Sequence, residues 1–459
     1  MSRVQPSRRV AAEVLGAVRT SDAYANLLLP VRIREAGLSS ADAGFATELV
    51  YGTLRMQGYY DKVVELASRR PAEKIDGPVL DVLRLGVHQL LSLRTAAHAV
   101  IDESVQLVRI ARKASAAGFV NGVLRTVARD DADTWRERSL AGLHGDARLA
   151  VEFSHPAWVV RALASALARE DAAGELDAAL AADNLPPQVA FAALPGLADP
   201  VALESGAGYR PGRLSPLALG STGGDPADRP EVAAGAVRVQ DEGSQLAALA
   251  LTRARPVTAG ESWLDLCAGP GGKAAVLAAE ARVGGAHLQA NEVVPARAGL
   301  VRNALAPFGS GADAPEVVEG DGRRFGEAGA RFDRVLLDAP CTGLGALRRR
   351  PEARWRKSAA DLAALTALQA QLLDAAVASL ASGGLLAYVT CSPHPAETLD
   401  QVDAVLARHP ELRAVDTPAV LGGISRAPLA LPERGSAQLW PHRHGTDAMF
   451  IQLLTKVEE

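Results

Sequence analysis

The feature that most constrains the fold of this chain is a strand–turn–helix pattern that repeats after residue 236. Short apolar runs end in an acidic or small polar residue, and helical stretches separate them. The runs are SWLDLCA, AHLQANE, EVVEGD, FDRVLLDAP and GGLLAYVTC. This alternation predicts a parallel, doubly wound α/β sheet. Since ligands bind at the carboxyl ends of the strands in such a sheet, we expect the functional residues there.

The first of these strand ends runs into a glycine-rich turn in LDLCAGPGGKAA, residues 264–275. Glycines let a backbone come close to a ligand, and the helix N-terminus that follows favours electronegative groups. Glu292 ends the next strand, where an acid can bind the two hydroxyls of a ribose. Asp321 follows the third strand and could accept a hydrogen bond from an adenine amino group. Together these elements predict a nucleotide-like cofactor site; an ordinary tight turn beside two incidental acids is the alternative.

The chain has three cysteines, and two of them follow the fourth and fifth predicted strands. Cys341 lies in LLDAPCTGLG and Cys391 in YVTCSPHP. The fourth and fifth strands of a doubly wound sheet are neighbours, so the two thiols are expected side by side over the cofactor. A free cysteine is most often a small buried hydrophobic residue, which is the role we favour for Cys267 under the glycine turn. Two thiols at equivalent strand ends indicate catalysis instead.

Paired thiols suit the methylation of carbon 5 of cytosine, which is a poor nucleophile. A thiolate that adds to carbon 6 makes an enamine, and carbon 5 of that enamine can attack a methyl group. The adduct must then lose its carbon 5 proton and expel the sulfur, which a second thiol can assist. A carboxyl group at the N3 and N4 edge makes the ring electron-poor, and Asp338 is placed for this role shortly before Cys341. Spacing alone leaves open which cysteine attacks.

The remainder of the chain divides into two further parts. Apolar residues recur every three or four positions up to about residue 129, so residues 1–130 are predicted to form an all-α bundle. Ser39–Ser40 and Gly77–Pro78 mark two of its helix starts. Residues 131–236 contain a helical piece, a short apolar run and a long loop-rich or hairpin stretch, which we interpret as a small intermediate domain. Residues 237–459 then form the α/β domain.

Charge and composition restrict the partners and the compartment. The net charge is -4, yet the first 129 residues carry 18 Lys and Arg against 12 Asp and Glu. This excess suggests a polyanion such as RNA, although a solvated basic surface explains it equally well. The sequence shows no signal-peptide core, long apolar run or zinc-type Cys/His spacing. We therefore expect a cytoplasmic protein without a membrane span, a bound metal or disulfides.

A run of basic residues interleaved with an aromatic one follows the Cys341 loop, in RRRPEARWRK at residues 348–357. Such a run can hold phosphates and stack an unpaired base. The candidate RNA-binding residues are Arg348, Arg349, Arg350, Arg354, Trp355 and Arg356. A solvated basic loop is the alternative interpretation.

These motifs resemble those of the RNA 5-methylcytosine methyltransferase family. LDLCAGPGGK, GDGRR, LLDAPCTGLG with RRRPEARWRK, and YVTCSPHPAE match that family's motifs in order. VQDEGSQL at 239–246 and LWPHRHGTDAMFIQLL at 439–454 resemble its flanking segments. LVYGTLR, LRLGVHQLL and GFVNGVLR resemble the NusB-like RNA-binding domain of one branch, the bacterial small-subunit ribosomal RNA methyltransferase B group. The resemblance implies a Rossmann-like methyltransferase domain that uses S-adenosylmethionine (AdoMet), with a NusB-like domain before it.

The resemblance also implies roles for individual residues. Cys391 corresponds to the cysteine that forms the covalent bond with cytosine carbon 6, Cys341 to the one that helps release the product, and Asp338 to the residue that polarises the base. The implied AdoMet contacts are Cys267, Ala268, Gly269, Pro270, Gly271, Gly272, Lys273, Glu292, Asp321 and Asp338. The implied substrate is a cytidine of small-subunit (16S) ribosomal RNA. Glu292 is a departure in detail, because aspartate is common at that position.

Two other functions compete with this one. The chain could be an RNA-binding ribosome-assembly factor whose methyltransferase domain is inactive, but the intact Cys391, Cys341 and Asp338 argue against it. A nucleotide-dependent oxidoreductase could share the glycine turn. That enzyme would leave both strand-end thiols and the basic run without a purpose.

Overall fold

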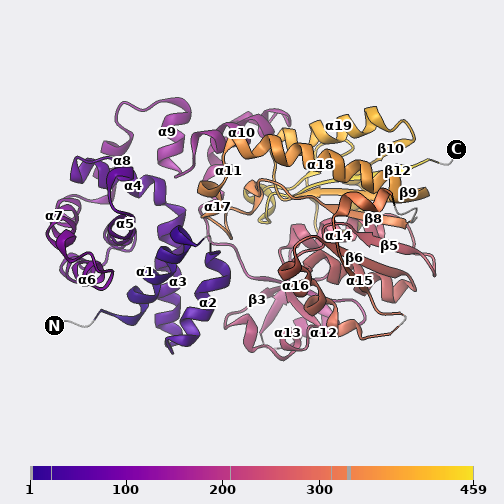
Figure 1. Cartoon of the computed structure of the whole chain (residues 1–459), viewed down its shortest axis with the longest axis horizontal. Coiled ribbons are helices and arrows are strands. Elements are labelled where there is room, and N and C mark those ends of the chain that lie inside the picture. The colour runs from indigo at the N-terminus through magenta and orange to yellow at the C-terminus, as the bar shows by residue number, and fades with distance from the viewer. Residues whose placement is uncertain (1–3, 22, 207, 312, 328–331, 458–459) are drawn as a thin grey trace. The chain divides into compact units, whose positions relative to one another are not determined.

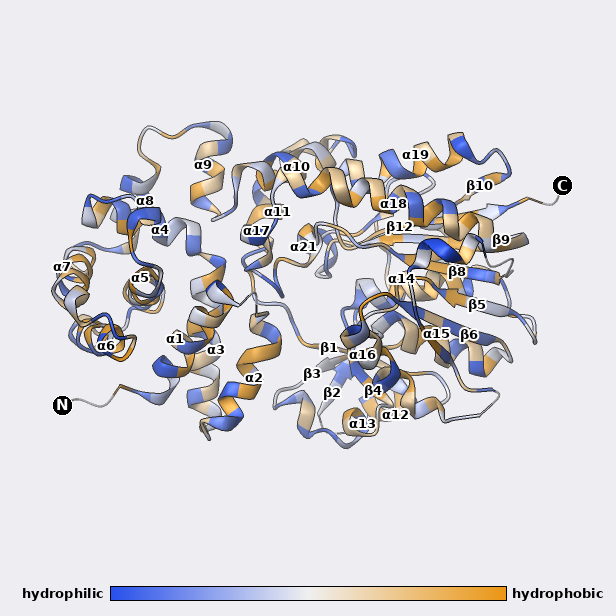
Figure 2. Ribbon diagram, in the orientation of Figure 1, coloured by the Kyte–Doolittle hydropathy of each residue, from blue (hydrophilic) through white to orange (hydrophobic). Residues whose placement is uncertain are grey.

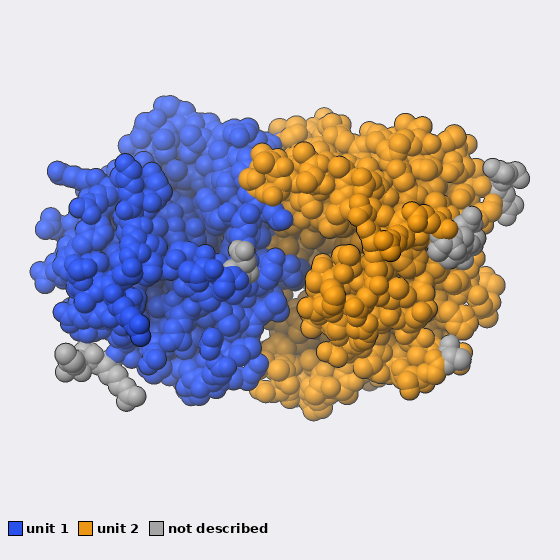
Figure 3. Space-filling view, viewed as in Figure 1, with its two compact units in different colours: residues 1–164, 174–185, 347–357 blue, residues 165–173, 186–346, 358–459 orange. Residues whose placement is uncertain are grey.

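The computed structural model describes residues 4–21, 23–206, 208–311, 313–327 and 332–457, which form two compact units (Figure 3). The helical unit comprises residues 1–164, 174–185 and 347–357. The sheet unit comprises residues 165–173, 186–346 and 358–459. The arginine-rich segment 347–357 therefore belongs to the helical unit, although both of its ends continue into the sheet unit.

Helices joined by short turns make up the helical unit (Figure 1). They are α1 (Pro6–Thr20), α2 (Ala25–Glu35), α3 (Ser40–Arg55), α4 (Gln57–Ser68), α5 (Gly77–Leu91), α6 (Ala97–Ile110), α7 (Ala117–Val127), α8 (Ala132–Leu140), α9 (Gly145–Glu152), most of α10 (Ala157–Ala168), α11 (Leu176–Ala182) and α17 (Ala353–Arg356), with the 3-10 turns η1 (Ala72–Lys74) and η2 (Ala114–Ala116). The predicted helical bundle is confirmed. The Ser39 hydroxyl caps α3 by accepting a hydrogen bond from the Asp42 N–H, and Pro78 lies in the first turn of α5, as the sequence predicted.

The main sheet of the sheet unit has eight strands, and five consecutive ones, from β9 to the edge strand β7, are parallel. The strands are β5 (Ser262–Asp265), β6 (His287–Glu292), β7 (Glu316–Glu319), β8 (Phe332–Asp338), β9 (Leu380–Thr390), β10 (Leu412–Val415), β11 (Ala437–Gln438) and β12 (Phe450–Lys456). Their order is β10-β12-β9-β8-β5-β6-β7, and β11 pairs with β12. The five predicted parallel strands are confirmed. The sheet is nevertheless mixed, because β12 runs antiparallel to β9.

Helices cover both faces of this sheet. They are α14 (Glu242–Arg253), α15 (Gly272–Gly284), α16 (Pro295–Leu305), α18 (Ala359–Ser379), α19 (Leu399–Arg408), α20 (Thr417–Ile424) and α21 (Pro441–His444), with the 3-10 turns η5 (Ala306–Phe308), η6 (Gly322–Gly326), η7 (Leu344–Ala346) and η8 (Pro395–Glu397). The 3-10 turn η3 (Ala173–Glu175) begins in the sheet unit and ends in the helical unit. β9 is mostly apolar along its length (Figure 2). Its side chains alternate between two cores: Ala387 and Val389 pack with α14 and α15, whereas Leu386 and Tyr388 pack with α18.

Among the described residues, α18 alone is long and apolar enough to cross a membrane, with a window of mean hydropathy 1.3. The helix packs on β8, β9 and η6. Its C-terminal half is buried there, including Leu372, Leu373 and Val377. Core helices of this kind pass the same length and composition test, so the finding is weak evidence for a membrane span.

A second, smaller sheet lies mostly in the predicted intermediate domain, with β1 in its short apolar run, β2 and β3 in its loop-rich or hairpin stretch, and β4 just after residue 236. It contains β1 (Ala190–Ala193), β2 (Tyr209–Pro211), β3 (Ala218–Ser221) and β4 (Val237–Val239) in the order β2-β3-β1-β4, flanked by α12 (Pro200–Glu204), α13 (Pro230–Ala233) and η4 (Pro226–Asp228). Strands of three or four residues are too short to show polar–apolar alternation. Phe191, Tyr209, Leu219 and Val237 form its core, and this long-range cluster makes the strands recognisable only in three dimensions.

Candidate active site

The carboxyl ends of β8 and β9 bring the two predicted thiols together. The strands are parallel neighbours, with Asp338 opposite Val389 in the register. Beyond the strand ends, the Sγ atoms of Cys341 and Cys391 lie 3.5 Å apart. This is the juxtaposition that the strand order predicted.

Backbone hydrogen bonds hold the loop after Cys341 against the turn after Cys391. The Gly345 N–H donates to the Cys391 carbonyl oxygen at 2.8 Å, and the Ala448 N–H donates to the Gly345 carbonyl oxygen at 2.9 Å. A Cβ atom at position 345 would lie 2.0 Å from the Ala448 oxygen, so this close approach requires glycine. Gly345, the second glycine of CTGLG, thus allows the segments around Cys341, Cys391 and Ala448 to meet.

Glu397 is the last residue of the motif YVTCSPHPAE, and the sequence assigned it no role in this site. Its side chain is fully buried. One carboxylate oxygen accepts hydrogen bonds from the Thr342 N–H at 2.8 Å and the Gln369 amide at 3.1 Å, and the other accepts from the Thr342 hydroxyl at 2.5 Å. The Thr342 hydroxyl also lies 3.0 Å from that of Ser392. Glu397 therefore ties the residue after Cys341 to the residue after Cys391.

Lys273, in the first turn of α15, extends to the Asp338 carboxylate. Its Nζ atom lies 2.8 Å from Asp338 Oδ2, and only 10% of its side chain is exposed. Burial, the largest single influence, lowers the pKa of Lys273, but the charge and hydrogen bond of Asp338 together with the charges of Cys391 and Asp265 raise it above its ordinary value. The lysine is therefore an ammonium group at neutral pH, and it orients the Asp338 carboxylate.

The two thiols have different electrostatic surroundings. The pKa of Cys391 is lowered, first because it accepts a hydrogen bond from the Cys341 thiol and also because the Lys273 ammonium is close. The pKa of Cys341 is raised by its hydrogen bond with Cys391, by burial and by the charge of Glu397. These surroundings favour a thiolate at Cys391 and a neutral thiol at Cys341.

The glycine turn between β5 and α15 closes against Glu292, which is buried at the end of β6. Glu292 Oε2 accepts a hydrogen bond from the Gly269 N–H at 3.0 Å, and Arg297 donates to the Gly269 carbonyl oxygen at 2.6 Å. A Cβ atom at position 269 would collide with the Glu292 carboxylate at 2.1 Å, so glycine is needed there. The predicted ribose-binding acid thus lies directly at the predicted cofactor turn.

Other predicted cofactor residues lie along the same strand ends. Cys267 is half-buried below the turn, and burial raises the pKa of its thiol, which suits a structural residue. The turn continues through Ala268, Pro270, Gly271 and Gly272, and Gly271 has a φ of 101°. Asp321 is half-buried after β7; its hydrogen bonds from the Arg323 side chain lower its pKa.

Asp265 is a second residue that the motifs did not single out, although it ends β5 within LDLCAGPGGK. Its side chain is fully buried, and neither carboxylate oxygen accepts a well-formed hydrogen bond from a described residue. Burial, followed by the nearby Asp338 charge, raises the pKa of Asp265 to about 8, and the Cys267 backbone offsets this only in part. A buried acid below the glycine turn is therefore left without a strong partner.

The arginine-rich segment differs from the sequence expectation. Arg354 was predicted to contact RNA, but it is completely buried in the helical unit. Its guanidinium donates to the Ser154 carbonyl oxygen and to Asn184 Oδ1, both at 2.9 Å. The prediction for Arg354 is wrong because the neighbouring backbone carbonyls, which the sequence cannot locate, take up its donors.

The other predicted RNA-binding residues of this segment are also buried, fully or in part. Arg348 is 7% exposed, while Arg349, Arg350, Trp355 and Arg356 are half-buried. The Arg356 guanidinium donates to the Val18 and Ala23 carbonyl oxygens and lies over the Tyr24 ring. The segment is thus built into the helical unit and is not an exposed basic loop.

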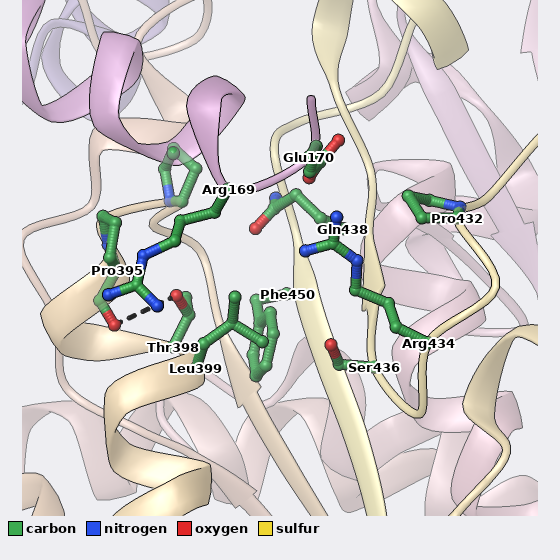
Figure 4. A pocket seen from close by; sticks show the side chains of 12 residues that line it. Arg169, Glu170, Pro395, Thr398, Leu399, Pro432, Arg434, Ser436, Gln438 and Phe450 are labelled. Carbon is green, nitrogen blue, oxygen red and sulfur yellow. Dashed lines mark hydrogen bonds between the residues drawn. The ribbon is translucent and has the colours of Figure 1, made fainter. Parts of the chain in front are cut away.

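A hollow of about 20 Å³ lies beside the turn that follows Cys391 (Figure 4). Arg169 and Arg434 approach it from opposite sides, and Pro395 and Phe450 contribute to its walls. This volume is enough for a water molecule but not for a pyrimidine ring. The described residues contain no group of three or more His, Cys, Asp or Glu side chains that could hold a metal ion.

Comparison with known proteins places this site in a family. A model of the family described as 16S rRNA methyltransferase RsmB/F matches residues 254–455, and a model of the NusB family matches residues 5–129. The chain is 46% identical to a Mycobacterium tuberculosis (strain CDC 1551 / Oshkosh) protein described as a methyltransferase, over 99% of this chain and 97% of that protein.

A second relative carries a more specific name. Ribosomal RNA small subunit methyltransferase B of Pseudomonas syringae pv. tomato (strain ATCC BAA-871 / DC3000) is 32% identical over 98% of this chain and 97% of its own. The solved structure of PH0851 shares the fold, with a TM-score of 0.80, 21% identity and coverage of 99% of this chain and 100% of that one. The chain therefore belongs to the RsmB/F family of ribosomal RNA methyltransferases and carries a NusB-family domain in its N-terminal part.

Proposed function

We propose that this protein transfers the methyl group of AdoMet to carbon 5 of a cytidine in small-subunit ribosomal RNA, through a covalent bond between Cys391 and cytosine carbon 6. The observation that carries the proposal is the meeting of Cys391, Cys341, Asp338 and Lys273 at one edge of the sheet. A methyltransferase that acts on a nitrogen or a hydroxyl would need no pair of thiols. Membership of a ribosomal RNA methyltransferase family supports the substrate class.

In this reaction Cys391 acts as the nucleophile. Its thiolate adds to carbon 6, and the Asp338 carboxyl group binds the N3 and N4 edge of the ring, where it stabilises the enamine that forms. The Lys273 ammonium holds Asp338 in place and favours the thiolate. After methyl transfer a water molecule takes the carbon 5 proton, and the electrons of that bond restore the carbon 5–carbon 6 double bond as the Cys391 sulfur leaves carbon 6 as a thiolate. The neutral Cys341 thiol, 3.5 Å away, stabilises the departing thiolate by a hydrogen bond.

The residues around the glycine turn fit AdoMet, which would supply an electrophilic methyl group. Gly269 and Gly271 allow close approach of the backbone, Glu292 offers a carboxylate to a ribose, and the orphan carboxyl group of Asp265 lies under the same turn. Asp321 would reach an adenine amino group after rearranging its contact with Arg323. We also propose the cytoplasm as the compartment, since ribosomal RNA is the substrate.

The test combines methyl transfer with adduct trapping. The protein is incubated with labelled AdoMet and unmodified small-subunit RNA, and 5-methylcytosine is mapped. We expect Cys391→Ala to lose both turnover and adduct, and Cys341→Ala to accumulate a protein–RNA adduct that survives denaturation. Cys267→Ala is the control, because its thiol lies outside the pair, and should form no excess adduct. Absence of transfer by the wild type, or an exchange of the two mutant phenotypes, would contradict the proposal.

A further inference from the structure

The helical unit contains a cavity of about 340 Å³ that has no part in the proposed reaction, although Trp355 and Arg356 of the basic run line it. Its walls come from α1, α3, α4, α5 and the segment 347–357, all within the helical unit. Ligand pockets in proteins usually span about 300–1,000 Å³, so the cavity can hold a small organic group. A single water molecule would occupy a much smaller space than this.

Most charged groups of the cavity already have partners. Glu352 is satisfied only in part: its Oε1 accepts a hydrogen bond from the Ala25 N–H at 3.1 Å, but its Oε2 has no partner among the described residues. Arg19 Nε lies 2.7 Å from Asp81 Oδ2, and the Arg84 guanidinium makes two hydrogen bonds to Asp61, at 2.6 and 2.8 Å. Asp81 also lies 3.6 Å from Arg84. An anionic ligand would have to compete with these carboxylates for the arginines. A purely apolar ligand would remove water from the ion pairs and offer no hydrogen bonds in its place. The cavity therefore favours a neutral ligand that has polar edges.

Two further groups specify that ligand. The Gln57 side-chain amide lines the cavity and has no hydrogen-bond partner among the described residues, so it offers both a donor and an acceptor. The indole of Trp355 forms another part of the wall. Its ring packs so closely on Gly58 that a Cβ atom there would lie 2.6 Å from it, which fixes the indole in place. A fixed aromatic surface beside a free amide suits a flat heterocycle with donors and acceptors at its edge.

We propose that this cavity binds the base of an unpaired nucleotide in the RNA substrate. A nucleobase is neutral and flat, carries donors and acceptors at its edge, and stacks on aromatic side chains. RNA is the polymer on which this family acts, and the cavity lies in the unit that contains the NusB-family domain. The site is separate from Cys391 and Cys341, and the inference does not depend on the covalent mechanism.

The experiment uses the full-length protein and small-subunit RNA substituted with 4-thiouridine. After irradiation, cross-linked peptides are identified by mass spectrometry. We expect cross-links in peptides that contain Gln57 or Trp355. Gln57→Leu, which removes both polar groups, should lower their yield about tenfold, and the nearly isosteric Gln57→Glu should also lower it because it removes the donor. Gln106→Leu on α6, outside the cavity, is the matched control and should leave the yield unchanged.

Free nucleotides could supply the same chemistry, so a second arm adds the four nucleoside 5′-monophosphates without RNA. Their binding is followed by ligand-observed NMR on the wild type and on Gln57→Leu. Competition between monophosphates and the RNA cross-link supports the proposal. If monophosphates bind but RNA does not cross-link to these peptides, the proposal is overturned. It is also overturned if the wild type and a folded Gln57→Leu variant give equal cross-link yields. Thermal melting of each variant identifies those that are folded.

Discussion

The Glu397 carboxylate accepts hydrogen bonds from both the N–H and the hydroxyl of Thr342, at 2.8 and 2.5 Å, and so links the loops that carry the two thiols. Thr342 directly follows Cys341, and Glu397 lies in the turn after Cys391. The distance between the thiols thus depends on a buried carboxylate whose hydrogen bonds go to Thr342 and Gln369 and not to either thiol. Its charge also disfavours a thiolate at Cys341.

Replacing Glu397 with glutamine should impair release of the product more than formation of the adduct. The amide retains one acceptor oxygen but presents an NH2 group to donors, so at least one hydrogen bond is lost at a cost of about 1–3 kcal/mol. Cys341 then loses its fixed position relative to Cys391. We expect the ratio of trapped protein–RNA adduct to methylated product to rise. Glu327→Gln, at an exposed position, is the control, and an unchanged ratio in Glu397→Gln would refute this role.

Removing the Lys273 ammonium should raise the pKa of Cys391 and reduce turnover. Lys273→Met leaves Asp338 without its partner at 2.8 Å and takes a positive charge away from the thiolate. The pH dependence of Cys391 alkylation by iodoacetamide, measured by mass spectrometry, should shift to higher pH, and methyl transfer should fall at least about tenfold. Lys273→Arg retains the charge and should show the smaller shift. Identical alkylation profiles for wild type and Lys273→Met would exclude the electrostatic role.

Asp265→Asn should stabilise the protein in a pH-dependent manner. The pKa of Asp265 is raised from 3.8 to about 8 in the folded protein, so the unfolded chain releases its proton above pH 4 while the folded chain keeps it until about pH 8. Wild-type stability therefore falls as the pH rises through this window, by at most about 1.4 kcal/mol per pH unit, and the penalty is constant above it. Asparagine has no such penalty.

Urea unfolding of the two proteins at pH 5, 6.5 and 8 checks this expectation. The advantage of Asp265→Asn should be smallest at pH 5 and largest at pH 8. The matched variant Asp76→Asn changes a half-exposed carboxylate whose partner is Lys113, which does not titrate in this range, and it should not reproduce the trend. A constant difference between wild type and Asp265→Asn would show that the carboxyl group is ionised throughout this range.

Arg354→Met should destabilise the helical unit by roughly 2–4 kcal/mol, because it leaves the Ser154 carbonyl oxygen and the Asn184 side chain without their buried donor. Burial lowers the pKa of Arg354 to about 10, which still leaves the guanidinium charged at neutral pH. Thermal melting measures the loss. RNA affinity of the folded variant should remain that of the wild type. If the variant bound RNA more weakly at an unchanged melting temperature, that result would support the RNA contact predicted from the sequence.

Much of the catalytic architecture could be predicted from local patterns. The apolar runs that end in Asp265, Glu292, Asp338 and Thr390 became β5, β6, β8 and β9, since runs of this length divided by amphipathic helices have few other ways to bury their surface. Their order along the chain implied that β8 and β9 pair. The proximity of Cys341 and Cys391 followed from that pairing and was predictable.

Features that depend on distant segments were not predictable in the same way. The strands of the small sheet are too short to show a periodic pattern, and they are stabilised by contacts such as the one between Phe191 and Tyr209. Arg354 looked like an RNA ligand in its own segment, but Ser154 and Asn184 enclose it. In each case the partner lies far away along the chain.

The sequence by itself determined the five parallel strands and the helices between them, the glycine turn and the presence of two thiols at neighbouring strand ends, because these follow from local periodicity and from the rules of parallel sheets. Only the tertiary structure decided which groups surround each thiol: Lys273 beside Cys391, and Glu397 behind Cys341. Electrostatic surroundings and burial arise from residues that meet only after folding. The same reason explains why Asp265 and Arg354 acquired their shifted pKa values and why their roles emerged only from the folded chain.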